Sequence, residues 1–409
     1  MPDLVCPSCS CLCDDIRLHI QGEELTRIEN ACLKGSAFFR AVWGRGWGRG
    51  GGGGGEVPLK EAVAAAVRLL SQARRPVIYG LDNSVVEAQQ VALKLARRLR
   101  AVVDDTSSFC QGALTEKIIA GQVPTCPLPE AAQLADLLVY WGANPYHAHP
   151  RHLSRYTYYP RAHYREAGWT PDVVLAGVEV RETETSITCH KVFYLPPKGD
   201  REFIGQVLAA LSGKGATGQA AAFASLLEQA HYTVFFIGLG LVYSLGNDLT
   251  PFLELLAESH RRGKAAAVPM VGHFNTMGLN YTLFRETGHI NRVSFANGGT
   301  VGHGPEFSIL EQLRQGAVDC LLVVGADPFT SLPHSLTAAL SAVPVICLDP
   351  FPTPTFERAQ VAISVAPSAV EVAGTARRMD GETVRLPQAL PARGPSDGEV
   401  LAMLLEAVG

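Results

Sequence analysis

Short apolar runs alternate with amphipathic stretches from Val57 onward. Many of the runs end at Gly, Asn or Asp, and helical periodicity marks the stretches 59–74, 85–99, 202–212 and 309–315. This alternation is typical of doubly wound α/β domains, whose helices cover both faces of a mainly parallel sheet. The predicted strands are residues 76–80, 102–103, 137–141, 173–180, 232–240, 320–325, 345–348 and 361–365.

Polar loops follow four of these strands. They read WGANP at 141–145, VRETET at 180–185, GADP at 325–328 and LDP at 348–350. Doubly wound sheets bind their ligands beyond the carboxyl ends of the strands, so the loops are where chemistry is expected. Because the strand–G-A-[ND]-P pattern occurs twice, it predicts two quasi-equivalent halves that each face an anionic nucleotide. Ordinary turn chemistry is the alternative explanation.

Cysteines dominate the first 35 residues. Cys6, Cys9, Cys13 and Cys32 form the pattern C-x2-C-x3-C-x18-C, and Lys34 follows the last of them. Three clustered thiols with a fourth returning from downstream suit a 4Fe–4S cluster. A structural zinc site is the alternative, although such sites prefer two CxxC pairs. Between the third and fourth cysteines, residues 16–28 alternate apolar and polar positions as a small β-hairpin would.

Composition narrows the class of protein. The chain has 409 residues, a hydrophobic fraction of 47% and a net charge of −4, which fits two or three globular domains and gives no electrostatic support for a nucleic-acid partner. Five of its ten cysteines fall within the first 32 residues, which favours metal ligation in a reducing compartment. We find no export signal and no apolar stretch of the roughly 20 residues that span a bilayer, so we expect a cytoplasmic protein.

A glycine run separates the cysteine-rich segment from the α/β pattern. It extends from Gly50 to Gly55 and follows three further glycines after Trp43. A flexible connection is the expected role. A phosphate-binding loop is the alternative, but no strand precedes the run and no GK[ST] closes it.

Cys110 stands between the predicted strand at 102–103 and Gln111-Gly112. A thiolate at such a strand-to-helix junction is suited to bind a metal or act as a nucleophile, because helix N-terminal amides lower its pKa. An inert buried thiol is the alternative. Residues 146–165 mix His, Arg and Tyr, which fits metal binding, recognition of phosphates or carboxylates, or a subunit interface.

Together these motifs resemble the molybdenum/tungsten bis-pterin oxidoreductases, and within that superfamily they look most like the B subunits of formylmethanofuran dehydrogenase. The resemblance covers nearly the whole chain in order. The long match at 140–156 is specific to these B subunits, whereas the cysteine spacing and the GT-x4-DG ending belong to the wider superfamily. Matching segments are residues 6–16, 29–35, 79–89, 102–112, 140–156, 178–186, 272–280, 325–329 and 371–381.

The resemblance implies roles for individual residues. The four cysteines of the first segment match the ligands of a 4Fe–4S cluster, and Lys34 matches the lysine between that cluster and a pterin. Cys110 matches the thiolate bound to tungsten or molybdenum. Two pterin guanine dinucleotides would be held by residues around the strand ends and near the end of the chain, namely Asn144, Arg181, Thr185, Asp327, Asp349, Gly374 and Thr375.

Two departures from the family pattern concern the metal site. Gln111 stands where the family has a histidine, and a glutamine cannot act as a general acid near neutral pH. The family also places an arginine near the metal, whereas residues 298–306, which match that stretch, contain none. Both departures bear on the redox step more than on metal binding.

The resemblance also implies a domain organisation. We expect an iron–sulfur module at 1–43, a linker at 44–55, a discontinuous α/β pterin-binding domain at 56–167 and 300–372, an inserted α/β domain at 168–299, and a pterin-contacting segment at 373–409. These would be domains of the formate dehydrogenase/DMSO reductase type without the C-terminal β-barrel domain. A separate D subunit would supply that barrel.

The implied activity is the reversible reduction of carbon dioxide to formate, with electrons from a ferredoxin-type carrier passing through the cluster. An amidohydrolase-like A subunit, assembled with the C and D subunits, would then condense formate with methanofuran or an analogue. The alternative is a cofactor-depleted, scaffolding B subunit of a bacterial formyltransferase/hydrolase complex. Gln111 favours the scaffold, while the retained cysteines and Lys34 oppose it. A formate dehydrogenase with another acceptor is a third option.

Overall fold

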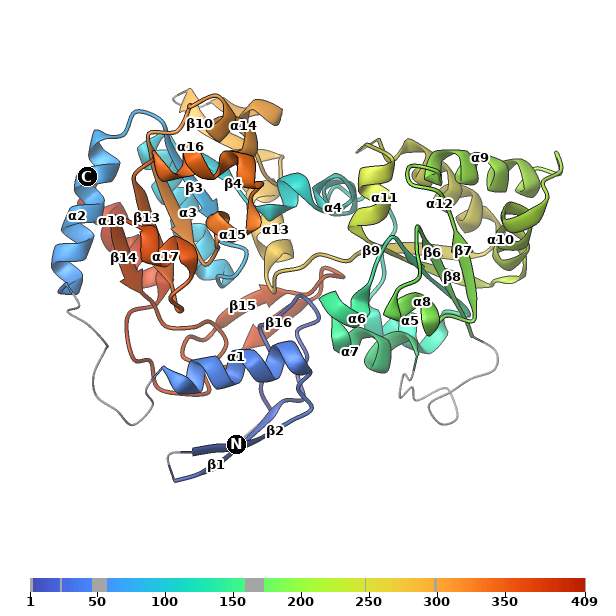
Figure 1. Ribbon diagram of the computed structural model, residues 1–409, viewed down its shortest axis with the longest axis horizontal. Helices are drawn as coiled ribbons and strands as arrows, with labels where there is room; N and C mark the ends of the chain where they lie inside the picture. The colour runs from blue at the N-terminus through green and yellow to red at the C-terminus, as the bar shows by residue number, and fades with distance from the viewer. Residues whose placement is uncertain are drawn as a thin grey trace. The chain divides into compact units, whose positions relative to one another are not determined.

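A computed structural model describes residues 3–22, 24–45, 57–158, 173–246, 248–297 and 300–408. The chain forms two compact units, each built on one central sheet flanked by helices (Figure 1). The first unit comprises Met1–Ser108, His273–Arg378 and Thr383–Gly409, and the second comprises Phe109–Gly272 and Met379–Glu382. Most of the predicted linker at 44–55 lies outside the described residues.

The first unit contains a seven-stranded sheet of order β11-β10-β4-β3-β12-β13-β14. Its last five strands run parallel, and β10 and β11 are antiparallel additions at one edge. In chain order the parallel strands read 2-1-3-4-5, which is a doubly wound order with its topological switch point between β3 and β12. The strands are β3 (Pro76–Gly80), β4 (Val102–Asp104), β10 (Val293–Asn297), β11 (Thr300–His303), β12 (Cys320–Val324), β13 (Val345–Asp349) and β14 (Val361–Ser364).

Helices of the first unit bury their apolar faces against this sheet and against one another. The fully buried strands β3, β12 and β13 lie in the core, as expected for parallel strands that are covered on both faces. The helices are α1 (Leu33–Gly44), α2 (Leu59–Gln72), α3 (Val86–Leu99), η1 (Thr106–Phe109, which crosses into the second unit), α13 (Thr276–Thr287), η3 (Pro305–Phe307), α14 (Ile309–Arg314), α15 (Pro328–Ser331), η4 (His334–Leu336), α16 (Thr337–Ser341), α17 (Pro354–Arg358) and α18 (Asp397–Ala407).

The second unit contains a five-stranded parallel sheet of order β7-β6-β5-β8-β9. In chain order this reads 3-2-1-4-5, again doubly wound, with the switch point between β5 and β8. Trp141 at the end of β5 is fully buried and donates its indole N–H to Asp200 Oδ1 at 2.6 Å. The strands are β5 (Leu137–Trp141), β6 (Val174–Glu179), β7 (Lys191–Tyr194), β8 (Tyr232–Ile237) and β9 (Lys264–Pro269).

Helices α9, α10 and α12 of the second unit pack on one another, at the right of Figure 1. A cluster of aromatic rings around Trp141, including Phe203, Phe223 and Phe252, fills the space beneath them. The helices of this unit are α4 (Gly112–Ile119), α5 (Leu128–Leu134), α6 (Pro145–Ala148), α7 (Pro150–His152), η2 (Leu153–Thr157), α8 (Glu184–Ile187), α9 (Asp200–Leu211), α10 (Gly218–Gln229), α11 (Leu239–Ser244) and α12 (Thr250–Arg262).

Two small antiparallel pairs complete the fold. The predicted hairpin at 16–28 is confirmed as β1 (Arg17–Gln21) and β2 (Glu24–Glu29). A second pair, β15 (Gly374–Arg377) with β16 (Thr383–Leu386), was not predicted, because strands of four residues are too short for their alternation to stand out from the surrounding polar sequence. No helix of the described residues is both long and apolar enough to span a bilayer.

The sheets divide the chain at other residues than those expected from the sequence. Residues 56–167 were expected to form one domain with 300–372, but β5 pairs with β6 and β8 in the second unit. Conversely, α13 and β10 fall within the expected inserted domain at 168–299, yet β10 pairs with β4 in the first unit. The crossings between the two sheets therefore lie at Ser108–Phe109 and Gly272–His273, and the short segment Met379–Glu382 returns once more to the second unit.

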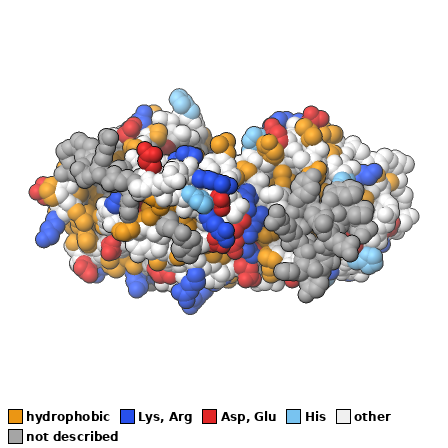
Figure 2. Space-filling model, turned by 90° about the horizontal axis from the view of Figure 1, so that it is seen from below, with side chains coloured by type: hydrophobic (Ala, Val, Ile, Leu, Met, Phe, Trp, Pro, Cys, Tyr) orange, Lys and Arg blue, Asp and Glu red, His pale blue; other side chains and the backbone are white. Residues whose placement is uncertain are grey.

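Charged side chains of both signs lie among apolar ones on the face shown in Figure 2. The absence of a nucleic-acid partner, expected from the net charge of −4, stays a prediction.

Candidate functional site

Three of the predicted cluster ligands lie in one loop of the first unit. Cys6, Cys9 and Cys13 are each 6 to 7% exposed. Leu4 and Ile16 exchange backbone hydrogen bonds of 2.8 and 3.2 Å that close the loop. Inside it, the Cys6 N–H donates to the Cys13 carbonyl at 2.8 Å. This pairing brings the first and third thiols of the motif to the same side of the chain.

Cys32 joins them from the start of α1. As the N-cap residue, it accepts the Gly35 N–H on its sulfur at 3.5 Å. A Cβ atom on Gly35 would lie only 3.0 Å from Cys6 Sγ and 3.9 Å from Cys32 Sγ. Glycine at position 35 therefore leaves room for sulfur atoms from both segments. Gly35 with the Cys6 and Cys32 thiols forms a cradle that joins the two segments, and Cys9 and Cys13 lie in the same loop as Cys6.

The thiols of the module differ in acidity. Burial raises the pKa of Cys6 to about 12. A hydrogen bond with Cys11 lowers the pKa of Cys9 to about 7, and the positive charge of Lys34 acts in the same direction. Thiolates are the form that binds metals. Lys34 therefore lies where its charge favours a thiolate, and the donor set of four sulfurs is one that iron–sulfur clusters and zinc both use.

Cys110 and Gln111 begin the second unit's first helix, so the predicted strand-to-helix junction is confirmed. Cys110 is partly exposed and follows the 3-10 turn η1, and Gln111 is the N-cap residue of α4. The Gln111 side chain is 1% exposed, and neither Oε1 nor Nε2 has a hydrogen-bond partner among the described residues. Thr115 Oγ1, one turn further along α4, is buried and equally without a described partner.

Asn144 and Thr185, both predicted site residues, lie in direct contact in the second unit. The Thr185 hydroxyl donates to Asn144 Oδ1 at 2.6 Å and accepts the Tyr146 N–H at 3.1 Å. Asn144 Nδ2 in turn donates to Glu184 at 3.2 Å. They meet because β5 and β6 are neighbouring parallel strands whose carboxyl ends lie at the same edge. Arg181 is exposed nearby and donates weakly to the Glu182 carbonyl at 3.5 Å.

The same arrangement recurs in the first unit between β12 and β13. The Thr355 hydroxyl donates to Asp327 Oδ1 at 2.5 Å and accepts the Phe329 N–H at 3.2 Å. Asn144 and Asp327 also share a backbone conformation, with φ of −114° and −125° and ψ of 76° and 77°. The preceding glycines, Gly142 and Gly325, adopt φ of +55° and +58°. The predicted quasi-equivalence of the two G-A-[ND]-P loops is confirmed in detail.

Each loop pair also carries a carboxylate at the end of its second strand. Glu179 accepts the Ala143 N–H at 3.1 Å, and Asp349 accepts the Phe351 N–H at 2.8 Å. Burial raises the pKa of each carboxyl to about 7. The two carboxylates stand six residues before Thr185 and Thr355 respectively, so they occupy equivalent positions.

Sequence reasoning identified Asp349 but missed its equivalent Glu179, and it missed Thr355. A signal was present, because 179–185 and 349–355 share the pattern [ED]-x3-T-x-T. The first threonine of each pattern, Thr183 or Thr353, caps the short helix that follows by accepting a backbone N–H on its hydroxyl. The first threonine of the pattern therefore caps a helix. The second, Thr185 or Thr355, is the latch: its hydroxyl holds the loop after the neighbouring strand by its bond to Asn144 or Asp327.

Gly374 and Thr375 lie on β15 and contact α3 and the residue before it. Thr375 donates its N–H and its hydroxyl to the Glu87 carboxylate at 2.9 and 2.7 Å. A Cβ on Gly374 would lie 2.6 Å from Val85 Cγ1, so a glycine is needed for β15 to approach the start of α3. These two predicted residues thus have a structural reason for their identity in addition to the predicted cofactor contact.

A buried acidic cluster anchors the turn that precedes Cys110. Asp82, Asp104 and Asp105 are fully buried, and burial raises the pKa of Asp104 to about 7 and that of Asp105 above its ordinary value. Three successive hydroxyls of the turn each donate to a different aspartate: Thr106 to Asp82 at 2.6 Å, Ser107 to Asp105 at 2.6 Å and Ser108 to Asp104 at 3.0 Å. Sequence reasoning did not identify this cluster, because burial of the aspartates is a tertiary property.

The histidines of 146–165 do not share one site within the described residues. His149 Nε2 contacts the Val271 carbonyl at 2.7 Å, His152 Nδ1 contacts the Tyr140 hydroxyl at 2.7 Å, and exposed His147 pairs with Glu184 at 3.0 Å. His163 lies outside the described residues. Their separate partners favour structural and loop-stabilising roles over the metal site that the sequence left open.

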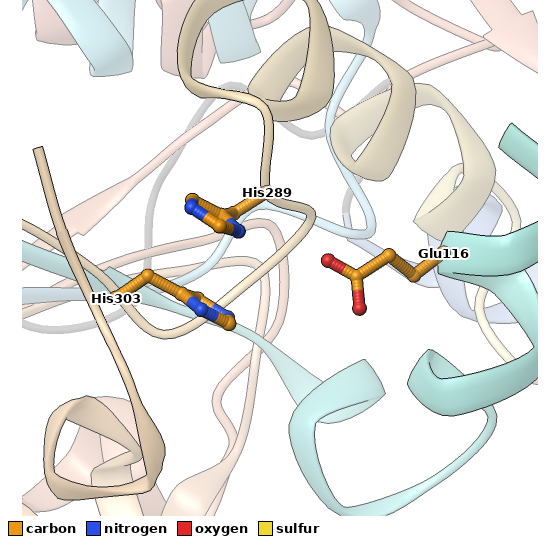
Figure 3. Close-up of side chains that lie close together, drawn as sticks. All are labelled: Glu116, His289 and His303. Carbon is orange, nitrogen blue, oxygen red and sulfur yellow. The ribbon is translucent and has the colours of Figure 1, made fainter. Parts of the chain in front are cut away.

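Another pair of histidines stacks in the first unit. The rings of His289 and His303 are parallel within 3° and their centroids are 3.8 Å apart (Figure 3). Glu116, also drawn there, belongs to the second unit. The stacked pair joins the end of α13 to β11 and was not anticipated from the sequence, in which the two residues are far apart.

Comparison with known proteins places the chain in a family. No protein-family model matches it. Over 426 aligned residues it is 30% identical to the B subunit of the tungsten-containing formylmethanofuran dehydrogenase 2 of Methanocaldococcus jannaschii, covering 99% of this chain and 98% of that protein. The protein of the same name from Methanococcus maripaludis is 28% identical with the same coverage.

A solved structure shares the fold. It is a chain of the formyltransferase/hydrolase complex of Methylorubrum extorquens, crystallised with methylofuran, and the match has a TM-score of 0.71 at 22% identity. The match covers 87% of this chain and 97% of that one. Sequence identity over nearly the full length of the Methanocaldococcus protein establishes the relationship, and the chain belongs to the family of formylmethanofuran dehydrogenase B subunits.

Proposed function

We propose that this chain is the catalytic redox subunit of a formylmethanofuran dehydrogenase and interconverts carbon dioxide and formate. Cys6, Cys9, Cys13 and Cys32 would hold a 4Fe–4S cluster, and Cys110 would bind tungsten or molybdenum carried by two pterin guanine dinucleotides. When bound, the metal centre supplies two-electron chemistry at carbon, and the cluster supplies the electrons one at a time. The observation that carries the proposal is the approach of the Cys6 and Cys32 thiols to Gly35, with Cys9 and Cys13 buried in the same loop as Cys6.

The cradle supports the cluster over a purely structural role for these cysteines. The Cys6 and Cys32 sulfurs come from two segments and lie so close to Gly35 that a Cβ there would be 3.0 and 3.9 Å from them, while Cys9 and Cys13 are buried in the same loop as Cys6. Lys34, whose charge favours the Cys9 thiolate, would also offset the negative charge of a bound cluster and thereby raise its reduction potential. A scaffold without cofactors has no use for either feature.

Two equivalent loop pairs support two equivalent dinucleotide sites. The contact of Asn144 with Thr185, and that of Asp327 with Thr355, holds each loop at the carboxyl end of a strand that borders a topological switch point. Glu179 and Asp349 would then offer carboxylate acceptors to N–H groups of a nucleotide base. Arg181, Gly374 and Thr375 would contact the remaining polar groups of the pterin dinucleotides.

The assembly belongs to the same proposal. The relatives are named as subunits of larger complexes, which supports partner subunits for this chain, including an amidohydrolase-like A subunit, a C subunit and a D subunit that supplies a barrel domain. A ferredoxin-type carrier would deliver electrons in the cytoplasm. The bound substrate would be carbon dioxide or formate, and the condensation with methanofuran or an analogue would take place on a partner.

A cofactor-depleted scaffold is the second candidate. It is favoured by Gln111 in place of a histidine and by the fold shared with a chain of a formyltransferase/hydrolase complex. Metal analysis of the purified complex separates the two functions. The redox subunit should contain about four iron atoms and about one tungsten or molybdenum atom per chain. A properly assembled complex without either metal would establish the scaffold instead.

Two substitutions make the assignment specific. Cys110→Ser should remove tungsten or molybdenum and abolish viologen-linked formate oxidation while the iron content is unchanged. Cys189→Ser is the matched control: Cys189 is also partly exposed in the second unit, and a serine hydroxyl can replace its contact with the Thr185 carbonyl. Full activity in the Cys110 variant would exclude that residue as the metal ligand.

A further inference from the structure

The side-chain amide of Gln111 is buried but makes no hydrogen bond with the described residues. Its side chain is 1% exposed at the N-terminus of α4, and its two polar atoms have no partner among the described residues. Thr115 is fully buried on the same helix, and its hydroxyl likewise has no hydrogen-bond partner among the described residues. Residues four apart lie on one face of a helix, so the Gln111 and Thr115 side chains project from the same side of α4.

A second buried glutamine, Gln89, provides a comparison, because its side-chain amide stabilises the fold. Gln89 is fully buried in the first unit, and its Nε2 donates to the carbonyls of Leu81, Ser84 and Asn275 at 2.9, 3.2 and 3.2 Å. Its Oε1 lacks a described partner, as unpaired acceptors more often do than donors. The difference between the two glutamines therefore lies in the donor, which is saturated in Gln89 and unused in Gln111.

Unused buried donors destabilise a protein, so their retention points to a ligand. We propose that Gln111 Nε2 and Thr115 Oγ1 form an uncharged two-donor site for a small carboxylate. Under the proposed function, on which this inference rests, that carboxylate is formate. Gln111 directly follows Cys110, the residue assigned to the metal.

The chemistry of the site matches a carboxylate. Two hydrogen-bond donors on one side of α4 complement the two oxygens of formate, and the N–H groups at the start of α4 add positive potential that favours an anion. Neither side chain titrates near neutral pH, so the site binds through hydrogen bonds without giving up a proton. Gln111 thus replaces a proton-transferring side chain with one that orients the one-carbon ligand.

The first test measures thermal stability of the complex purified from cells deprived of tungstate and molybdate. Gln111→Met removes the unused donors at similar volume, so the melting temperature should rise by about 2 °C or more. Gln89→Met, the matched control, breaks three hydrogen bonds and should lower it. If Gln111→Met lowers the melting temperature as Gln89→Met does, the amide serves the fold and the inference is overturned.

The second test measures binding of sodium formate to the metal-loaded complex by calorimetry. Gln111→Met should raise the dissociation constant about tenfold, and Thr115→Val should raise it about threefold to tenfold, each for the loss of one hydrogen bond. Thr115→Ser keeps the hydroxyl and should restore binding. Unchanged formate affinity in both Gln111→Met and Thr115→Val would overturn the inference.

The two failures are distinguishable. Metal content is determined on the same samples, so a complex with metal but with unchanged formate binding refutes the donor site alone. A wild-type complex without tungsten, molybdenum or iron refutes the proposed function, and with it the assignment of formate as the ligand.

Discussion

The Thr355 hydroxyl donates to Asp327 Oδ1 at 2.5 Å, and the corresponding bond from Thr185 to Asn144 measures 2.6 Å. The two bonds close loops of matching backbone conformation in different sheets. Their surroundings differ at one point. Asn144 uses its Nδ2 to donate to Glu184, whereas Asp327 accepts the hydroxyl hydrogen of Thr330 on its second oxygen.

This difference predicts that exchanging amide and carboxylate will destabilise one loop more than the other. Asn144→Asp would replace a donor with a carboxylate beside Glu184, so like charges would repel and the loop should lose order. Asp327→Asn keeps an oxygen for Thr355, and its new amide can donate to the Thr330 oxygen. We expect Asn144→Asp to lower the melting temperature of the complex clearly and Asp327→Asn to lower it little. Equal losses would contradict the proposed difference between the loops.

Stability should decrease as the pH rises between about 4 and 7. Glu179 and Asp349 have pKa values of about 7 in the folded chain, mainly because of burial, and lower values when unfolded. A carboxyl with a raised pKa stabilises the fold while it is protonated, and this stabilisation is lost as the pH rises through the folded pKa. Above that range the contribution is constant.

Asp349→Asn tests this dependence. The asparagine oxygen can still accept the Phe351 N–H, but the buried charge is gone. In complexes lacking bound metal, the variant should melt about 2–4 °C above wild type at pH 8 and show no such advantage at pH 4. A stability gain of the same size at both pH values would show that charge burial is not the cause.

Gly35→Ala should impair iron binding. The added Cβ would lie 3.0 Å from Cys6 Sγ, so the thiol must shift by a few tenths of an ångström from the position it needs to bind iron. We expect the iron content to fall to less than about half of the roughly four atoms of a 4Fe–4S cluster. Gly44→Ala, at the other end of α1, is the control, because no atom lies within 4 Å of its added Cβ. Iron analysis that finds the two variants alike would remove the support that Gly35 gives to the cluster.

The acidic cluster should support the turn before Cys110. Ser107→Ala removes the hydroxyl that donates to Asp105 and accepts from Asn291 at 2.7 Å, which should cost about 1–3 kcal/mol of stability. Tungsten or molybdenum content should decrease while iron is retained. Ser212→Ala, an exposed serine at the end of α9, serves as the control. Unaltered metal content in a destabilised Ser107 variant would separate the turn from the metal site.

Buried parallel strands were the part of the fold most readily predicted. Strands β3 and β5 match the predicted residues 76–80 and 137–141, because strands covered on both faces consist of continuous apolar residues. The sequence does not reveal which strands pair, since pairing depends on contacts between distant segments. For that reason the expected domain boundaries placed β5 and the residues of β10 in the wrong unit.

The candidate site was predictable where it depended on local motifs. The four cysteines and the G-A-[ND]-P loops are read directly from their spacing, and the structure brings Asn144 together with Thr185 as two predicted residues. Glu179 was missed although the [ED]-x3-T-x-T pattern marks it, because the meaning of that pattern becomes clear only when the structure shows the two loops to be equivalent. The unused amide of Gln111 was likewise invisible, because a side chain's lack of partners is known only once its surroundings are known.

Each strand-end loop is latched by a threonine that follows the neighbouring strand of its own sheet. A substitution that breaks one latch therefore leaves every bond of the other in place. Because the two loops are held by separate bonds, substitutions can change one loop while the other keeps its structure. The two loops can therefore acquire different ligand preferences without loss of the fold.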